Sequence, residues 1–220
     1  MTASTNRDEG LITIQAAGVT LEGNLIIPAG ATGIVLFAHG SGSSRFSSRN
    51  RHVAEELRNG GLGTLLIDLL THDEELVDTR TAHLRFDIEL LARRLLGTAE
   101  WLHGAQPKMK IGLFGASTGG GAALVAAAEK PALISAVVSR GGRPDLAGDA
   151  LPKVKAPTLL IVGGDDEPVI GMNRQAYARM TGTFAKLQIV PGASHLFEEP
   201  GTLEQVAKLA REWFRKYLSS

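Results

Sequence analysis

The 220-residue chain contains no cysteine, and its positive and negative side chains cancel, with 23 of each sign. Without cysteine it forms no disulfides, offers no thiolate metal ligands and has no thiol nucleophile, so covalent catalysis needs an oxygen or nitrogen atom. Without net charge, no overall field attracts a polyanion, which argues against nucleic acid as a partner. Long apolar runs are also missing, and the polar N-terminus does not resemble a signal peptide, so we expect no membrane association and a cytoplasmic location.

Short apolar segments alternate with helical patterns along most of the chain. Continuous apolar runs predict buried parallel strands at 33–38, 63–69, 110–114, 133–138, 158–162 and 185–190. Apolar periodicity predicts helices at 50–59, 82–103, 119–129, 171–180 and 203–218. Two β-rich segments, 11–16 and 20–28, predict an antiparallel hairpin at the sheet edge. The pattern predicts an α/β fold with a mainly parallel, doubly wound sheet, and no linker divides the single domain expected over 1–220.

A serine with small neighbours follows the predicted strand 110–114. Gly115-Ala116-Ser117-Thr118-Gly119 matches the G-x-S-x-G pattern of a nucleophile held on a sharp turn between a strand and a helix. The same residues are compatible with an ordinary tight turn. They also partly match the dinucleotide-binding pattern, in which Arg140, at the end of the next strand, would meet the 2′-phosphate of NADP. That pattern lacks its middle glycine here, because Ser117 occupies the position.

A serine nucleophile needs a base and a group that orients the base. His195 follows the predicted strand 185–190, and the acidic turn Gly163-Gly164-Asp165-Asp166-Glu167-Pro168 follows the strand 158–162. Ligands of parallel sheets gather at the carboxyl ends of the strands, where these residues and Ser117 all fall. The order Ser, Asp, His is the order of α/β-hydrolases. We therefore expect a catalytic triad.

Acyl transfer also needs N–H donors for the oxyanion. The N–H of Thr118 is the first candidate, and the N–H of Ser41 in His39-Gly40-Ser41-Gly42 is the second. For His39 we favour a structural role that braces this loop. The other histidines lack ligand spacing, so no metal and no cofactor are expected.

Four blocks of the sequence resemble the α/β-hydrolase superfamily, and within it the small, cap-free hydrolases similar to dienelactone hydrolase. They are His39–Ser44, Gly115–Gly119, Gly163–Val169 and Gly192–His195. The resemblance implies that the acid lies in a G-x-x-D-x-x-V turn, which places it on Asp166 and leaves Asp165 as the reserve. Residues 141–156, where larger relatives insert a cap, are too few for one. Dienelactone hydrolases carry a cysteine where this chain has Ser117, so ester hydrolysis is implied but that particular substrate is not.

The expected function is therefore hydrolysis of short-chain carboxylic esters or lactones through an acyl-enzyme intermediate. Without a cap we expect a small, open pocket lined by Phe46, Leu70, Met172, Leu196 and Phe197. Arg140 and Arg143 are either solvated or placed to meet a substrate carboxylate. The alternative from another class is a non-catalytic module of the same fold that binds a small ligand or a partner protein.

Overall fold

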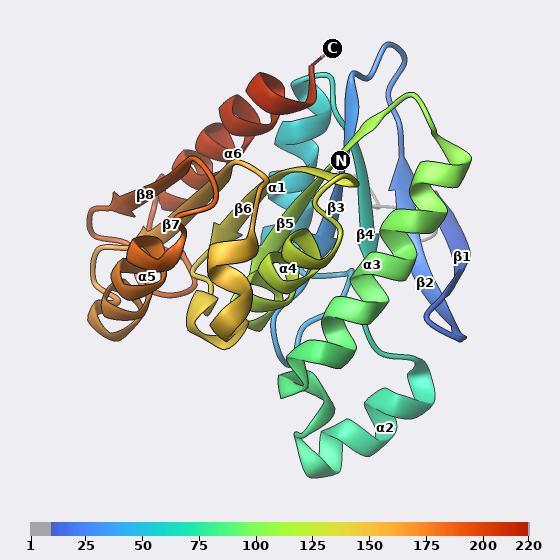
Figure 1. Ribbon diagram of the computed structural model, residues 1–220, viewed down its shortest axis with the longest axis horizontal. Helices are drawn as coiled ribbons and strands as arrows, with labels where there is room; N and C mark the ends of the chain where they lie inside the picture. The colour runs from blue at the N-terminus through green and yellow to red at the C-terminus, as the bar shows by residue number, and fades with distance from the viewer. Residues whose placement is uncertain (1–9, 220) are drawn as a thin grey trace, which may run out of the picture.

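A single eight-stranded sheet organises the protein (Figure 1), whose computed structural model describes residues 10–219. The strand order is β1-β2-β4-β3-β5-β6-β7-β8. The strands are β1 (Leu11–Ala16), β2 (Val19–Ile26), β3 (Gly33–Ala38), β4 (Gly63–Ile67), β5 (Lys110–Ala116), β6 (Ile134–Arg140), β7 (Thr158–Gly163) and β8 (Ala185–Val190). β1 and β2 are antiparallel and form the predicted hairpin, whereas β4, β3 and β5 to β8 are parallel.

Helices cover both faces of the sheet. One face carries α1 (Ser48–Asn59) and α6 (Thr202–Leu218), which contact each other. The other carries α3 (Ile88–Ala105), α4 (Thr118–Glu129) and α5 (Glu167–Arg179), together with the 3-10 segment η2 (Pro144–Lys153) that joins β6 to β7. This arrangement is the predicted α/β-hydrolase architecture, and η2 lies where a cap would have been inserted.

The central strands are buried on both faces, as a parallel sheet between two helical layers requires. Along β3, Val35 and Phe37 join the apolar cluster under α1 and α6, whereas Ile34, Leu36 and Ala38 join the cluster under α3 and α4. This two-sided burial explains the continuous apolar runs in the sequence, and it fixes the strand ends that carry the candidate site.

The predicted helix 82–103 is wrong at its start. The structure instead has α2 (His72–Thr81), the short 3-10 turn η1 (Leu84–Phe86) and then α3. The carboxylate of Asp78 accepts the backbone N–H groups of Leu84 and Arg85 at 2.7 and 3.1 Å, which holds the chain in a turn. Asp87 caps the new helix by accepting the N–H of Leu90 at 2.9 Å. In Figure 1, α2 projects beyond the rest of the molecule.

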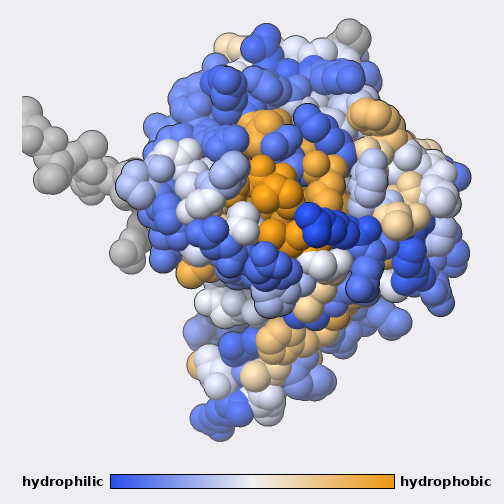
Figure 2. Space-filling model, turned by 90° about the vertical axis from the view of Figure 1, so that its left-hand side faces the viewer, coloured by the Kyte–Doolittle hydropathy of each residue, from blue (hydrophilic) through white to orange (hydrophobic). Residues whose placement is uncertain are grey.

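The opposite end of the sheet is closed by β8 and α5. Figure 2 looks onto this end and shows an apolar area at its centre. Val162, Val169 and Ile170 form a small buried cluster there, against which Leu187 and Ile189 pack with partial exposure. Within the described part of the chain, no helix has the length and apolar character needed to cross a bilayer.

Candidate active site

Ser117 lies on a strained turn between β5 and α4. Its backbone has φ 49° and ψ −121°, a conformation that non-glycine residues rarely adopt. Tight packing maintains this turn: a Cβ at Gly115 would lie 2.4 Å from the Gly119 carbonyl oxygen, and one at Gly119 would lie 2.3 Å from the Ala38 carbonyl oxygen. The small residues of the motif therefore let the chain turn sharply and present the half-buried Ser117 above the sheet.

The residue at the middle position argues against dinucleotide binding. In that pattern the first and third glycines serve the turn and the packing of the helix on the strand, and the middle glycine lets the backbone approach a pyrophosphate. Gly120 is packed in this way, since a Cβ there would lie 2.6 Å from the Ser139 hydroxyl. The middle position, however, carries the side chain of Ser117.

His195 and Asp166 come from different loops and are joined by a hydrogen bond. The Nδ1 of His195 lies 2.7 Å from the Oδ2 of Asp166. Asp166 is the residue before the first turn of α5, where an aspartate usually caps the helix, yet its side chain caps no N–H here. The carboxylate is directed to the imidazole instead, whereas the side chain of Asp165 is exposed to solvent.

Backbone contacts between the two loops explain this pairing. The N–H of Asp165 donates to the carbonyl of Ala193 at 3.0 Å, and that of Gly164 donates to the carbonyl of Val190 at 2.8 Å. A Cβ at Gly163 would lie 2.3 Å from the Ala193 carbonyl oxygen, so the loops approach as closely as glycine allows. The Asp166 and His195 loops therefore form one unit.

Glu199, which the sequence did not predict as a site residue, holds the loop that carries His195. Its carboxylate accepts the N–H of Ser194 at 3.0 Å. Hydrogen bonds from Ser194 lower the pKa of Glu199, so it is ionised at neutral pH. Its only signal in the sequence is its position four residues after His195, which is too weak to predict this role.

The two candidate oxyanion donors, the N–H groups of Thr118 and Ser41, lie beside the strained turn that carries Ser117. Thr118 is the first residue of α4, whose N-terminal end favours negative charge. Ser41 follows Gly40, and a Cβ at Gly40 would lie 3.1 Å from the Cβ of Ser117. The loop that carries Ser41 therefore passes directly over the turn that carries the serine.

His39 braces this loop. The N–H of Leu69 donates to its Nε2 at 3.1 Å, and its Nδ1 lies 3.0 Å from the carbonyl oxygen of Gly40. Because Nε2 accepts this bond, Nδ1 is the nitrogen that donates to the Gly40 carbonyl. The ring thereby ties the end of β3 to the end of β4.

A cavity of about 980 Å³ opens beside Thr118 and Ser41. Its walls are formed by the β1–β2 hairpin, by the loop after β3, and by the segment that runs from the end of β4 through α2 and η1. Most of the residues that line it are polar, although apolar atoms form the larger part of its surface, and its apolar side chains are Phe46, Leu69, Leu70 and Leu91. This cavity is larger than the small pocket that the missing cap led us to expect. The difference arises because the projecting α2, which the sequence did not predict, supplies one wall.

Two of the five predicted lining residues, Phe46 and Leu70, face this cavity, and the other three are not in its lining. Phe197 is corrected to a core residue: only 1% of it is exposed, and it packs in the cluster under α1 and α6. Leu196 is exposed and Met172 is half-buried in α5. The turn after His195 reverses the side-chain direction at Phe197, whose φ is 57°.

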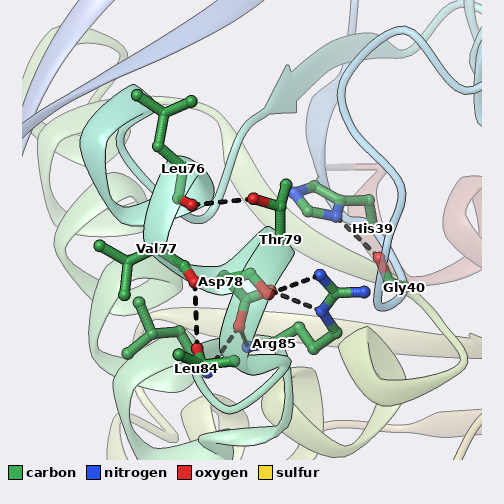
Figure 3. A network of polar contacts seen from close by, with 9 residues as sticks. His39, Gly40, Leu76, Val77, Asp78, Thr79, Leu84 and Arg85 are labelled. Carbon is green, nitrogen blue, oxygen red and sulfur yellow. Dashed lines mark hydrogen bonds and ion pairs between the residues drawn. The ribbon is translucent and has the colours of Figure 1, made fainter.

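An ion pair between Arg85 and Asp78 lies on the cavity wall, and the sequence did not predict it. Figure 3 shows the guanidinium of Arg85 turned towards Asp78, with His39 and Gly40 nearby. Arg85 Nε donates to Asp78 Oδ2 at 2.5 Å, and its Nη2 donates to the Asp78 carbonyl at 2.9 Å. Burial by itself would raise the pKa of Asp78, but the bonds from Arg85 and Leu84 outweigh it and lower that pKa. The pair is thus charged and holds the turn between α2 and α3.

Arg140 and Arg143 have different surroundings. Arg143 is half-exposed and bonded to Asp145, with 2.8 Å between Nη2 and Oδ2, so its charge is already paired. Arg140 is buried, and within the part of the chain that the structure describes its one side-chain hydrogen bond joins Nη2 to the Asn50 Oδ1 at 3.3 Å. Burial and the neighbouring Arg49 lower the pKa of Arg140 to about 10, so it remains charged at neutral pH.

No metal centre emerges from residues 10–219: within that range, no three histidine or acidic side chains are grouped to hold an ion.

Comparison with known proteins places this geometry in a family. The model of the dienelactone hydrolase family matches residues 21–219. A crystal structure of dienelactone hydrolase from Anabaena variabilis is 64% identical, with a TM-score of 0.92 over 94% of this chain and 97% of that one. An α/β serine hydrolase of Xanthomonas campestris described as having no lid is 20% identical, with a TM-score of 0.75 over 96% and 95% of the two chains, and supports the fold alone.

A longer relative also matches. A Mycobacterium tuberculosis protein whose name proposes a phosphoribosyl transferase is 57% identical over 96% of this chain, which corresponds to 47% of that protein. The chain thus spans about half the length of the curated relatives it matches. The family model covers nearly all of the sheet and every candidate catalytic residue. The chain therefore belongs to the dienelactone hydrolase family.

Proposed function

We propose that this protein is a serine hydrolase that cleaves short-chain carboxylic esters or lactones. The observation that carries the proposal is the His195–Asp166 bond of 2.7 Å, formed at the sheet edge where Ser117 occupies its strained turn. Strain and a partly buried histidine–aspartate pair are retained at such a position when they serve catalysis. Family membership supports hydrolase chemistry, and the choice of a carboxylic ester is our inference from the serine nucleophile.

In the proposed mechanism, Ser117 Oγ attacks the ester carbonyl as His195 Nε2 takes its proton. Asp166 accepts the Nδ1–H of His195, which leaves the Nε2 lone pair free for the serine. The N–H groups of Ser41 and Thr118 stabilise the oxyanion, helped by the N-terminus of α4. His195 then protonates the leaving alcohol and activates water, which releases the acid and restores Ser117. No step requires a cofactor.

The transferase name of the mycobacterial relative does not favour a second function for this chain. That protein is about twice as long as the match, so we propose that any transferase activity resides in the half that this chain does not match. A non-catalytic binding role, in contrast, would leave the strained turn and the His195–Asp166 pair without a purpose.

Labelling with a fluorophosphonate tests the proposal directly, because only an activated serine is phosphonylated rapidly. We expect one label per chain on Ser117, identified by peptide mass spectrometry, and no label in Ser117→Ala. Ser219→Ala, at an exposed serine after the end of α6, is the matched control and should label like the wild type. A folded wild-type protein that stays unlabelled would favour the binding-module alternative.

Substrate length gives a further prediction. The cavity offers only four apolar side chains, so we expect kcat/KM to rise over the first acyl carbons and then stop rising. Each buried methylene contributes about 0.8 kcal/mol, or roughly fourfold, only while apolar wall remains. The measurement is kcat/KM for p-nitrophenyl acetate, butyrate, octanoate and palmitate in matched detergent. A maximum at octanoate or palmitate would contradict the short-chain assignment.

A further inference from the structure

Arg140 is a buried cation without an anionic partner among residues 10–219. Its side chain, 7% exposed, extends from the carboxyl end of β6 to Asn50 in the first turn of α1. Its Nε and Nη1 atoms are buried and have no hydrogen-bond partner among the described residues. Two other arginines with little exposure pair with carboxylates: Arg45 with Asp68 and Arg94 with Glu74. Arg140 therefore differs from them in its lack of a counter-ion.

A second positive charge and a helix N-terminus lie next to Arg140. The charge of Arg49 acts on Arg140 and helps lower its pKa. Arg49 Nη1 donates to Glu198 at 2.9 Å, but the Glu198 side chain is 63% exposed, and the buried Nε of Arg49 has no hydrogen-bond partner in the described part of the chain. Arg49 is the second residue of α1 and Arg140 bonds to the third, Asn50, so both side chains lie near a helix N-terminus that adds a partial positive charge. Among the described residues, the exposed Glu198 is the one carboxylate that pairs with either arginine.

Arg140, Arg49 and the first turn of α1, which we call the cationic cluster, lie next to the candidate triad. The N–H of Ser117 donates to the carbonyl of Arg140 at 3.2 Å. A Cβ on the next residue, Gly141, would lie 3.6 Å from the Cε1 of His195, and Glu198 follows that histidine by three residues. The large cavity beside Thr118 is lined by neither Arg49 nor Arg140. The cluster is therefore a separate feature, next to the place where the ester would react.

We propose that Arg140, Arg49 and the first turn of α1 form a subsite for a phosphate monoester group carried by the substrate. A phosphate dianion would displace exposed Glu198 from Arg49 and balance both guanidinium charges, whereas a carboxylate balances only one. Helix N-termini are suited to phosphate. An uncompensated buried charge opposes folding, so its presence is explained if an anion supplies the missing partner during turnover. This inference rests on the proposed ester hydrolysis and specifies its substrate class.

Three p-nitrophenyl esters of similar length test the subsite: those of 3-phosphonopropanoic, succinic and pentanoic acid, with the phosphonate standing for the phosphate. In Arg140→Met we expect kcat/KM for the phosphonate ester to fall by roughly 10- to 100-fold, as for loss of a hydrogen bond to a charged group. Hydrolysis of the neutral ester should stay within about threefold. Arg179→Met, which removes an exposed, paired charge at the end of α5, is the matched control and should change none of the three.

The Tm of Arg140→Met distinguishes a binding role of Arg140 from a structural role. Removing an uncompensated buried charge should leave the Tm of Arg140→Met equal to or above that of the wild type. A lower Tm with equal losses on all three esters would overturn the proposal in favour of a structural arginine. A larger loss on the succinyl ester than on the phosphonate ester would overturn the phosphate assignment and indicate a carboxylate subsite.

Direct binding makes the test independent of turnover. Inorganic phosphate titrated calorimetrically into Ser117→Ala should bind, and the additional change Arg140→Met should weaken that binding at least tenfold. Equal phosphate binding in the two proteins would refute the subsite. Fluorophosphonate labelling of the wild type distinguishes the two levels of failure: an unlabelled serine disproves the proposed hydrolase, whereas a labelled serine without any preference for the phosphonate ester disproves only the subsite.

Discussion

Ser117→Ala is expected to lower kcat for p-nitrophenyl acetate by roughly 10⁴- to 10⁶-fold, because the acyl-enzyme cannot form without the hydroxyl. His195→Ala should cost nearly as much, since an unactivated serine is a weak nucleophile at neutral pH. Steady-state kinetics on purified variants, with active-site titration to exclude traces of wild type, measures both effects.

The double variant sharpens this prediction. If Ser117 and His195 act as one unit, removing both should be within about tenfold of the worse single variant. Losses that multiply would show that the two residues contribute independently and would contradict the triad. Neither side chain belongs to the buried core, so the Tm of each variant should remain close to that of the wild type. A collapse in Tm would mean that the activity loss reports unfolding.

Asp166→Asn is expected to lower kcat by roughly 10⁴-fold, because an amide can donate to Nδ1 and so favour the tautomer whose Nε2–H faces the serine. The neighbouring carboxyl provides the matched control. The exposed Asp165 contributes only its backbone N–H to the loop, so Asp165→Asn should retain kcat within about fivefold. The comparison uses kcat at a pH where wild-type activity has reached its plateau. Loss of turnover in Asp165→Asn alone would move the acid by one position.

The sequence was informative where a local pattern reflects a local physical requirement. Continuous apolar runs predicted strands because a parallel sheet between two helical layers buries both faces of each strand. The glycines around Ser117 were recognisable because a sharp strand-to-helix turn leaves no room for Cβ atoms. The carboxyl ends of parallel strands share one edge of the sheet. Ser117, Asp166 and His195 each follow such a strand, so all three were expected at that edge.

The sequence was least informative where helix and turn compete. The segment 72–87 is polar and charged, and nothing in its periodicity separates α2 from α3. The division depends on Asp78, whose carboxylate satisfies two backbone N–H groups of the following turn and pairs with Arg85. That arrangement requires the chain to be folded back on itself already. It determined both the helix boundary and one wall of the large cavity.

By itself the sequence determined the fold class, the strained serine turn and the choice of residues at the strand ends, because each depends on neighbours within a few positions. Only the tertiary structure decided which groups meet across long separations. The close contact of the loops after β7 and β8 directs Asp166, and not Asp165, to His195. The contact of Arg140 with Asn50 of α1 buries this arginine beside Arg49, and among residues 10–219 it forms no ion pair with a carboxylate. A residue's charge is written in the sequence, but whether it is compensated depends on what the whole fold brings next to it.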